Sequence, residues 1–230
     1  RFARAAMAKG LPPTGRERWL AIAILVFLGA TALGALAPAR NSDDAAGHLP
    51  FALWLAEGGH PWHGHQFSVG YYPNVPHGIY AAGMTLVGLP GGRGINLLFL
   101  AASLVFVERL GRDLFGRSEP GLLAALLWVT TIPVGIYTMK TYLDVPYASY
   151  ALGAALLLVR WSRTQASSDA GWAILFGAFS ASAKSHGLVV FLLVATWVVG
   201  VWRPSHPTRA RTILGFGLVS LAWIVPWYLR

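Results

Sequence analysis

The chain contains no cysteine, and it contains few charged residues for its length. The absence of cysteine excludes a disulfide framework and thiol chemistry. Only 12% of the 230 residues are charged, which is roughly half of the ~25% typical of soluble domains. Hydrophobic residues make up 55% of the chain and gather in several long runs. The composition therefore indicates an integral membrane protein.

Acidic residues are especially scarce, because nine Asp and Glu stand against 18 Lys and Arg and leave a net charge of +9. The basic residues flank the apolar runs instead of lining one face, so we expect no nucleic-acid partner. Ten Trp and eight Tyr fit a protein that anchors at the two interfaces of a membrane.

Seven apolar runs are long enough, or nearly long enough, to cross a bilayer. We therefore expect an all-α fold, a polytopic membrane helix bundle with about seven transmembrane helices. An eighth apolar stretch, residues 77–89, has 13 residues with three Gly, and a Pro precedes it. That length suits an interfacial helix better than a crossing one. The seven runs are residues 19–37, 95–110, 121–137, 146–161, 172–183, 188–202 and 213–228.

The distribution of basic residues predicts the orientation. If residues 77–89 do not cross, 13 of the 18 basic residues fall on the side of the N-terminus. By the positive-inside rule that side is the cytoplasm. We expect a cytoplasmic tail over residues 1–18 and a single transmembrane module over residues 19–230, in which an outer loop over residues 38–94 carries surface helices. The basic residues gather in the tail and in residues 108–119, 160–169 and 203–211.

An acidic pair, Asp43 and Asp44, opens the outer loop and precedes a predicted weakly amphipathic helix over residues 45–57. One interpretation is that the pair caps this helix, because acidic charge is favourable at a helix N-terminus. The alternatives are a general base or a divalent cation site at the membrane surface. No cofactor is predicted firmly, and the metal ligands, if any, stay open.

Two further outer turns carry charges. Lys140 and Asp144 lie in one, and Lys184 and His186 lie in the other. Asp144 suits the first turn of the next helix, because Pro146 follows it at an early helical position. Either lysine could extend its side chain to the membrane interface. A lysine among apolar spans usually faces a partner or a polar cavity. We therefore predict an anion site, suited to a phosphate, at Lys184 and His186.

Five motifs follow one another in a characteristic order. An acidic pair with a helix, "SDDAAGHLPFALWLAEGG", precedes an aromatic and proline-containing stretch with a surface helix, "YYPNVPHGIYAAGMTLVGL". Arg93-Gly-Ile-Asn96 then opens a span that ends in the basic loop "ERLGRDLFGR". Asp144-Val-Pro146 follows the next span, and "GAFSASAKSHG" ends in the segment around Lys184. This order resembles the GT-C superfamily of membrane glycosyltransferases, especially the bacterial branch of protein O-mannosyltransferases and lipid A aminoarabinose transferases.

The resemblance implies transfer of a sugar from a polyprenyl-phosphate carrier to an acceptor at the periplasmic face of the bacterial inner membrane, with inversion. Asp43 or Asp44 would act as the base, and Asp144 would orient the acceptor, hold a metal or fix the basic residues. Negative charge grows on the lipid phosphate as it leaves. The groups expected to stabilise it are Lys184, His186, Arg93 and Lys140.

Two other classes of function stay open. One is a non-catalytic subunit that keeps the module as a scaffold in a larger membrane complex. We also expect the sequence to be part of a longer chain, because it begins with Arg1 and its last span ends near Arg230. The other class is a transporter or channel, although the charges gather at one interface and no internal repeat is evident.

Overall fold

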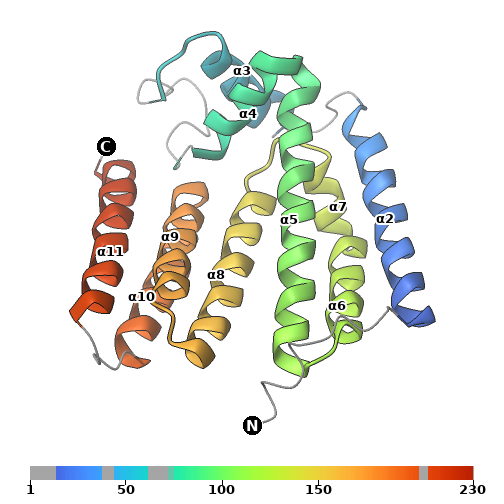
Figure 1. Cartoon of the computed structure of the whole chain (residues 1–230). Coiled ribbons are helices and arrows are strands. Elements are labelled where there is room, and N and C mark those ends of the chain that lie inside the picture. Colours follow the sequence, from blue (N-terminus) through green and yellow to red (C-terminus); the bar gives the residue numbers. More distant parts are fainter. Residues whose placement is uncertain (1–13, 38–43, 62–72, 74, 202–206, 230) are drawn as a thin grey trace.

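The computed structural model describes residues 14–37, 44–61, 73, 75–201 and 207–229. Every regular element in these residues is helical, so the all-α prediction is confirmed (Figure 1). The elements are α2 (Gly15–Ala35), η1 (Asp44–His48, a π-helical turn), α3 (Leu49–Ala56), α4 (Val75–Val87), α5 (Leu89–Phe115), α6 (Ser118–Thr130), α7 (Ile132–Thr138), α8 (Asp144–Thr164), α9 (Ser167–Ala183), α10 (Gly187–Val201) and α11 (Pro207–Tyr228).

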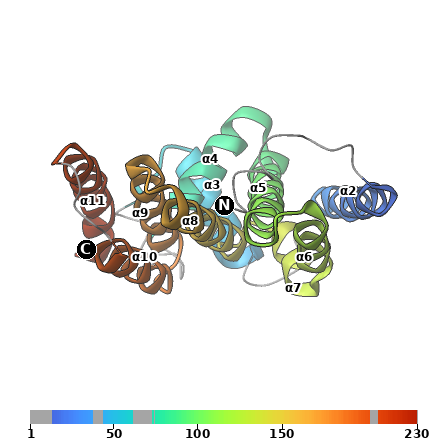
Figure 2. The ribbon, with the colours of Figure 1, turned by 60° about the horizontal axis from the view of Figure 1, so that its bottom comes forward.

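The long helices run alongside one another, and α3 and α4 cover one end of them (Figure 1). We call this the α3–α4 end. The chain reaches it at the ends of α2, α7 and α9 and leaves it at the starts of α5, α8 and α10. Seen from the other end, the helices form an elongated row, with α5 and α8 near its middle (Figure 2). The order of helices is the one that the seven apolar runs predict.

Fewer helices are long and apolar enough to cross a membrane than the seven that the sequence predicts. In the described residues three helices qualify, namely α2, α5 and residues 210–228 of α11. A fourth qualifies only if α6 and α7, which meet at an angle of 67°, count as one broken span. The prediction of seven spans is therefore not supported. The physical reason is that α9 and α10 are short, with 17 and 15 residues, and that α8 is less apolar, since its first turns hold polar and aromatic residues and Arg160 lies near its end.

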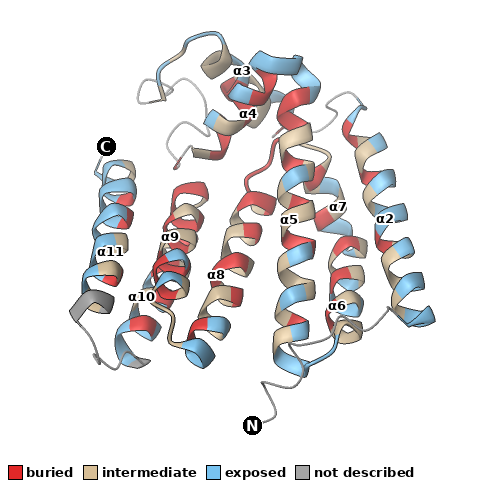
Figure 3. Ribbon diagram, in the orientation of Figure 1, coloured by how far each residue is buried: buried red, intermediate tan, exposed pale blue. Residues whose placement is uncertain are grey.

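The outer surface of the bundle is strongly apolar. Large side chains such as Leu25, Leu127, Leu193 and Leu218 are each more than half exposed on different helices. Buried positions gather on the inward faces of the same helices (Figure 3). On α9 they are mostly small, among them Ala170, Ala173, Ala178 and Ala181, which lets neighbouring backbones approach as in membrane helix packing. These features indicate membrane association.

Helix α4 corresponds to the stretch that the sequence places along the interface. It has 13 residues, too few to cross a bilayer. Gly88, with φ +74°, ends it, and the chain then turns into α5 (Figure 1). Gly83 and Gly91 face each other so closely that a Cβ on Gly91 would overlap the Gly83 carbonyl. This contact holds α4 against the first turn of α5.

Candidate functional site

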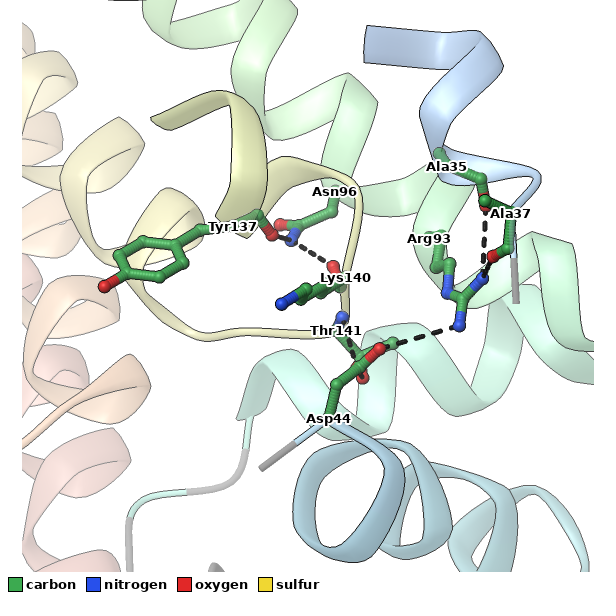
Figure 4. A network of polar contacts seen from close by, with 8 residues as sticks. All are labelled: Ala35, Ala37, Asp44, Arg93, Asn96, Tyr137, Lys140 and Thr141. Carbon is green, nitrogen blue, oxygen red and sulfur yellow. Dashed lines mark hydrogen bonds and ion pairs between the residues drawn. The ribbon is translucent and has the colours of Figure 1, made fainter. Parts of the chain in front are cut away.

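Polar side chains from several elements meet at the α3–α4 end (Figure 4). They surround residues 139–143, which connect α7 to α8 and which we call the α7–α8 turn. Its neighbours are η1, the C-terminus of α2 and the first two turns of α5. Segments far apart in the sequence thus build one site.

Asp44 is the first residue of η1 and is fully buried. Its Oδ1 accepts hydrogen bonds from the backbone N–H of Thr141, at 2.9 Å, and from the Thr141 hydroxyl, at 2.5 Å. Its Oδ2 lies 3.5 Å from Nη2 of Arg93 and has no hydrogen-bond donor in the described residues. In this arrangement the carboxylate is closed off from solvent.

Arg93 is also buried, with 8% of its surface exposed. Its Nη1 donates to the carbonyls of Ala35, at 3.3 Å, and Ala37. The last carbonyls of a helix have no partner within it, so Arg93 satisfies the C-terminus of α2. The guanidinium is engaged by these carbonyls and by Asp44. The structure therefore places Arg93 as a buried connector, whereas the sequence suggested a phosphate ligand.

Asn96 lies three residues after Arg93, on the same face of α5. Its Nδ2 donates to the carbonyls of Tyr137, at 2.9 Å, and Lys140, at 2.6 Å, with the Tyr142 carbonyl at 3.3 Å. The hydroxyl of Tyr80 lies 3.0 Å from Asn96 Oδ1 and 2.7 Å from the Tyr142 carbonyl. Asn96 and Tyr80 thus bind the backbone of the α7–α8 turn from inside.

Lys140 is the second residue of the α7–α8 turn. Its side chain is half-buried, and Nζ lies 5.5 Å from the centre of the Tyr142 ring, in cation–π range. Throughout the described residues it forms no ion pair with an acid. Its charge is therefore available to an anion.

Asp144 and Lys184 form a second, more open group. Lys184 Nζ donates to Asp144 Oδ1 at 2.6 Å, and the side chains are 35% and 38% exposed, respectively. Asp144 begins α8 and Lys184 ends α9, so the pair joins these helices where they reach the α3–α4 end. The exposed His186 lies two residues further on. The structure thus brings together two charges that the sequence placed in separate turns.

The two carboxylates act on a common neighbour. The pKa of Tyr80 is raised well above its usual value, first by burial and then by the charges of Tyr150, Asp144 and Asp44. Asp44 contacts Thr141, and Asp144 lies three residues further along the chain, at the start of α8. The buried and the open groups therefore belong to one region.

A histidine pair adjoins this region. His48 Nδ1 and His77 Nε2 lie 2.9 Å apart, and the rings stack with centres 5.1 Å apart. His77 is fully buried, and burial, with His48 as the second cause, lowers its pKa well below the usual value. No local sequence pattern predicts this pair, because the two residues are 29 positions apart.

Asp43, which the sequence offers as a base, a cap residue or a cation ligand, lies outside the described residues. In the part of the chain that the structure describes, no three His, Asp or Glu side chains gather closely enough to hold a metal ion. The residues that sequence reasoning missed are Thr141, Tyr80 and, as a contact to the turn, Asn96. Only Asn96 gave a signal, as a polar residue near the start of an apolar run.

An apolar groove of about 420 Å³ lies between α8 and α10. This volume is within the range of small-molecule sites, which measure about 300–1,000 Å³. Leu193 and Trp197 at its rim are more than half exposed, so the groove opens on the outer surface. Its walls include Ala151, Ala155 and Leu158 of α8 and Val190, Val194 and Trp197 of α10.

No protein-family model, curated protein or solved structure matches this chain. A functional proposal therefore depends on the arrangement of side chains and on the order of motifs in the sequence.

Proposed function

We propose that the chain is a membrane glycosyltransferase module. It transfers a sugar from a polyprenyl-phosphate donor to an acceptor hydroxyl at the α3–α4 end. In this proposal α2, α5, the α6–α7 pair, α8, α9, α10 and α11 all cross the bacterial inner membrane, with polar flanks completing the shorter helices. The N-terminus is cytoplasmic and the α3–α4 end faces the periplasm, as the positive-inside rule requires.

The observation that carries the proposal is the open Asp144–Lys184 pair at the same end of the bundle as Lys140, which has no acidic partner within the described residues. Transfer from a lipid phosphate needs a carboxylate that accepts the acceptor's proton. It also needs a cation that stabilises the charge growing on the leaving phosphate. Both kinds of group are solvent-accessible at the same end of an apolar bundle, where a lipid-linked substrate would present its headgroup.

Each residue then has a role. Lys184 holds Oδ1 of Asp144, and Oδ2 accepts the proton of the acceptor hydroxyl. The acceptor oxygen forms a bond to the anomeric carbon, while the bond from that carbon to the phosphate oxygen breaks and its electron pair leaves with the phosphate. Lys140 and His186 stabilise the released polyprenyl phosphate. Attack opposite the phosphate inverts the anomeric centre.

The apolar groove suits the hydrocarbon part of such a donor. Ala151 lies seven residues after Asp144 in α8, a rise of about 10 Å at 1.5 Å per residue. A lipid whose phosphate binds at the α3–α4 end would therefore lead its chain towards the groove. Burial of each CH₂ group contributes about 0.8 kcal/mol.

A scaffold subunit without catalysis is the second candidate. It is favoured by the burial of Asp44 and Arg93, two residues that a catalytic site would be expected to expose. In that case the α3–α4 end would serve only to join helices. The chain would then release no polyprenyl phosphate, or would do so at a rate that does not depend on the accessible charges.

The deciding experiment uses the purified chain in liposomes. We would supply polyprenyl-phosphate-linked sugars with a panel of lipid and peptide hydroxyl acceptors and measure release of polyprenyl phosphate. Asp144→Asn should lower the rate by roughly 100-fold or more, as expected for loss of a general base. Asp113→Asn is the matched control, because Asp113 pairs with Arg160 at the opposite end of the bundle. Release that is absent, or indifferent to Asp144, would favour the scaffold.

A further inference from the structure

We infer that Asp44 is a positioning residue that holds Lys140 in place, and not the base of the reaction. This inference rests on the proposed function, since it assigns to Lys140 the donor phosphate. It departs from the interpretation of the acidic pair that the sequence alone suggests.

The first step concerns access. A general base must come within hydrogen-bond reach of the proton that it removes. Asp44 has no exposed surface, and its Oδ1 already accepts two hydrogen bonds from Thr141. Its Oδ2 faces Arg93, which is itself buried. An acceptor hydroxyl could reach this carboxylate only if the surrounding elements separated.

The second step concerns one peptide group. The carbonyl of Lys140 and the N–H of Thr141 belong to the same planar unit. Asn96 binds that carbonyl at 2.6 Å, and Asp44 binds that N–H at 2.9 Å. Both edges of the peptide plane are therefore held, and the backbone of Lys140 cannot rotate on that side without breaking a contact (Figure 4).

The third step concerns charge. Burying an ion pair is costly, so such pairs often add little stability compared with apolar residues. A buried ion pair can instead select one arrangement of the elements that it joins. Here the Asp44–Arg93 pair joins η1 and α5, and Arg93 extends the connection to α2. These connected residues hold the turn that contains Lys140, the lysine of this region that has no acidic partner in the described residues.

The first experiment compares two valine substitutions in the reconstituted protein. Thr141→Val removes the hydroxyl donor to Asp44, and we expect it to raise the KM for a polyprenyl-phosphate sugar about tenfold without moving the pH profile. Thr138→Val is the matched control, since Thr138 is also buried and its hydroxyl donates only to Val134 of its own helix. Asp44→Asn should raise the same KM, and its effect should not add fully to that of Thr141→Val, because both changes act on the contact between Asp44 and Thr141.

A catalytic Asp44 gives the opposite pattern. Asp44→Asn would then remove the acidic limb of the pH profile and depress kcat, while Thr141→Val would leave kinetics close to normal. That result would overturn the inference.

The second experiment does not depend on glycosyl transfer. Because the chain has no cysteine, Lys140→Cys provides a single thiol for a water-soluble maleimide. Adding Thr141→Val should make labelling faster, and adding Thr138→Val should not. An inactive wild-type protein that shows this labelling change would refute the proposed function but keep the positioning role. Equal labelling with both valines would reject the positioning role.

Discussion

At the scale of single residues, the two lysines of the α3–α4 end carry the same charge in different surroundings. Lys184 lies 2.6 Å from Asp144, so its charge is largely compensated. Lys140 contacts the face of Tyr142 and lacks an acid within the described residues. An incoming phosphate would therefore gain more from Lys140 than from Lys184, although the sequence ranks Lys184 first.

His77 predicts a pH dependence of stability. Its pKa in the folded protein lies well below the usual value of 6.5, because burial and the neighbouring His48 both disfavour the charged form. The unfolded chain binds more protons below that pH, so stability is present above pH 6.5 and is lost as the pH falls. The midpoint of thermal unfolding in detergent should drop between pH 7.5 and pH 5.5.

The variant His77→Phe keeps the ring volume and removes the titration, so it should show a weaker drop than the wild type. His186→Gln is the control, because His186 is exposed and its replacement should leave the pH dependence unchanged. Equal slopes for the wild type and His77→Phe would show that other groups cause the acid sensitivity.

At the scale of elements, the close contact between α4 and α5 allows a sharp comparison. Gly91→Ala would place a methyl group against the backbone of Gly83, and overpacking of this kind costs about 1–3 kcal/mol. Gly94→Ala lies one turn further along α5, where nothing is within 4 Å of the new Cβ. There alanine should stabilise the helix by about 0.5–1 kcal/mol.

Thermal unfolding of the two variants should therefore move in opposite directions from the wild type. Similar shifts for both would mean that α4 does not pack on α5 through these glycines.

The positions of the long helices are easier to predict from the sequence than the bends within them. Apolar runs located each long helix, because hydrophobic burial in a bilayer requires long apolar segments. The run over residues 121–137 was predicted as one span, but the chain bends between α6 and α7. Pro133 lacks the N–H that would continue the helix, and Thr131 adopts an extended conformation. Pro133 is therefore the sequence feature that marks this bend.

The candidate site was predictable only in part. The number of expected spans between these residues places Asp44, Lys140, Asp144 and Lys184 at one end of the bundle. Their partners were not predictable, because Asp44 meets Thr141 across 97 residues and no local pattern encodes such a contact. Burial of Asp44 follows from this long-range contact, so the sequence could not distinguish an internal acid from an accessible one.

At the scale of the whole molecule, the topology can be tested through α9. The exposed Ser168 lies in its first turn and the exposed Ser185 lies two residues after its last residue, and the chain has no native cysteine. If α9 crosses the membrane, Ser185→Cys should react with an impermeant thiol reagent added outside intact cells. Ser168→Cys should react only after permeabilisation. Labelling of both from one side would show that α9 does not cross, and the outward placement of Lys184 would then lose its support.

The groove between α8 and α10 links the shape of the bundle to its proposed substrate. Its walls are apolar and it opens outward, so a hydrocarbon chain could enter it from the side. Ala155→Trp would fill the space left by small side chains on α8. For donors with long prenyl chains the KM should rise about tenfold or more, because loss of even two buried CH₂ groups costs roughly 1.6 kcal/mol. For donors with a single isoprene unit the KM should stay near the wild-type value, since so short a chain does not span the rise of about 10 Å from Asp144 to the groove.

The matched control is Ala124→Trp, which adds the same ring to an exposed position on α6 away from the groove. It should leave the KM unchanged for long and short donors alike. Equal loss with long and short donors in Ala155→Trp would mean that the new ring disturbs the headgroup site. Full activity with long donors would mean that the chain follows another path along the bundle. The length dependence thus separates a site for the lipid chain from a general packing defect.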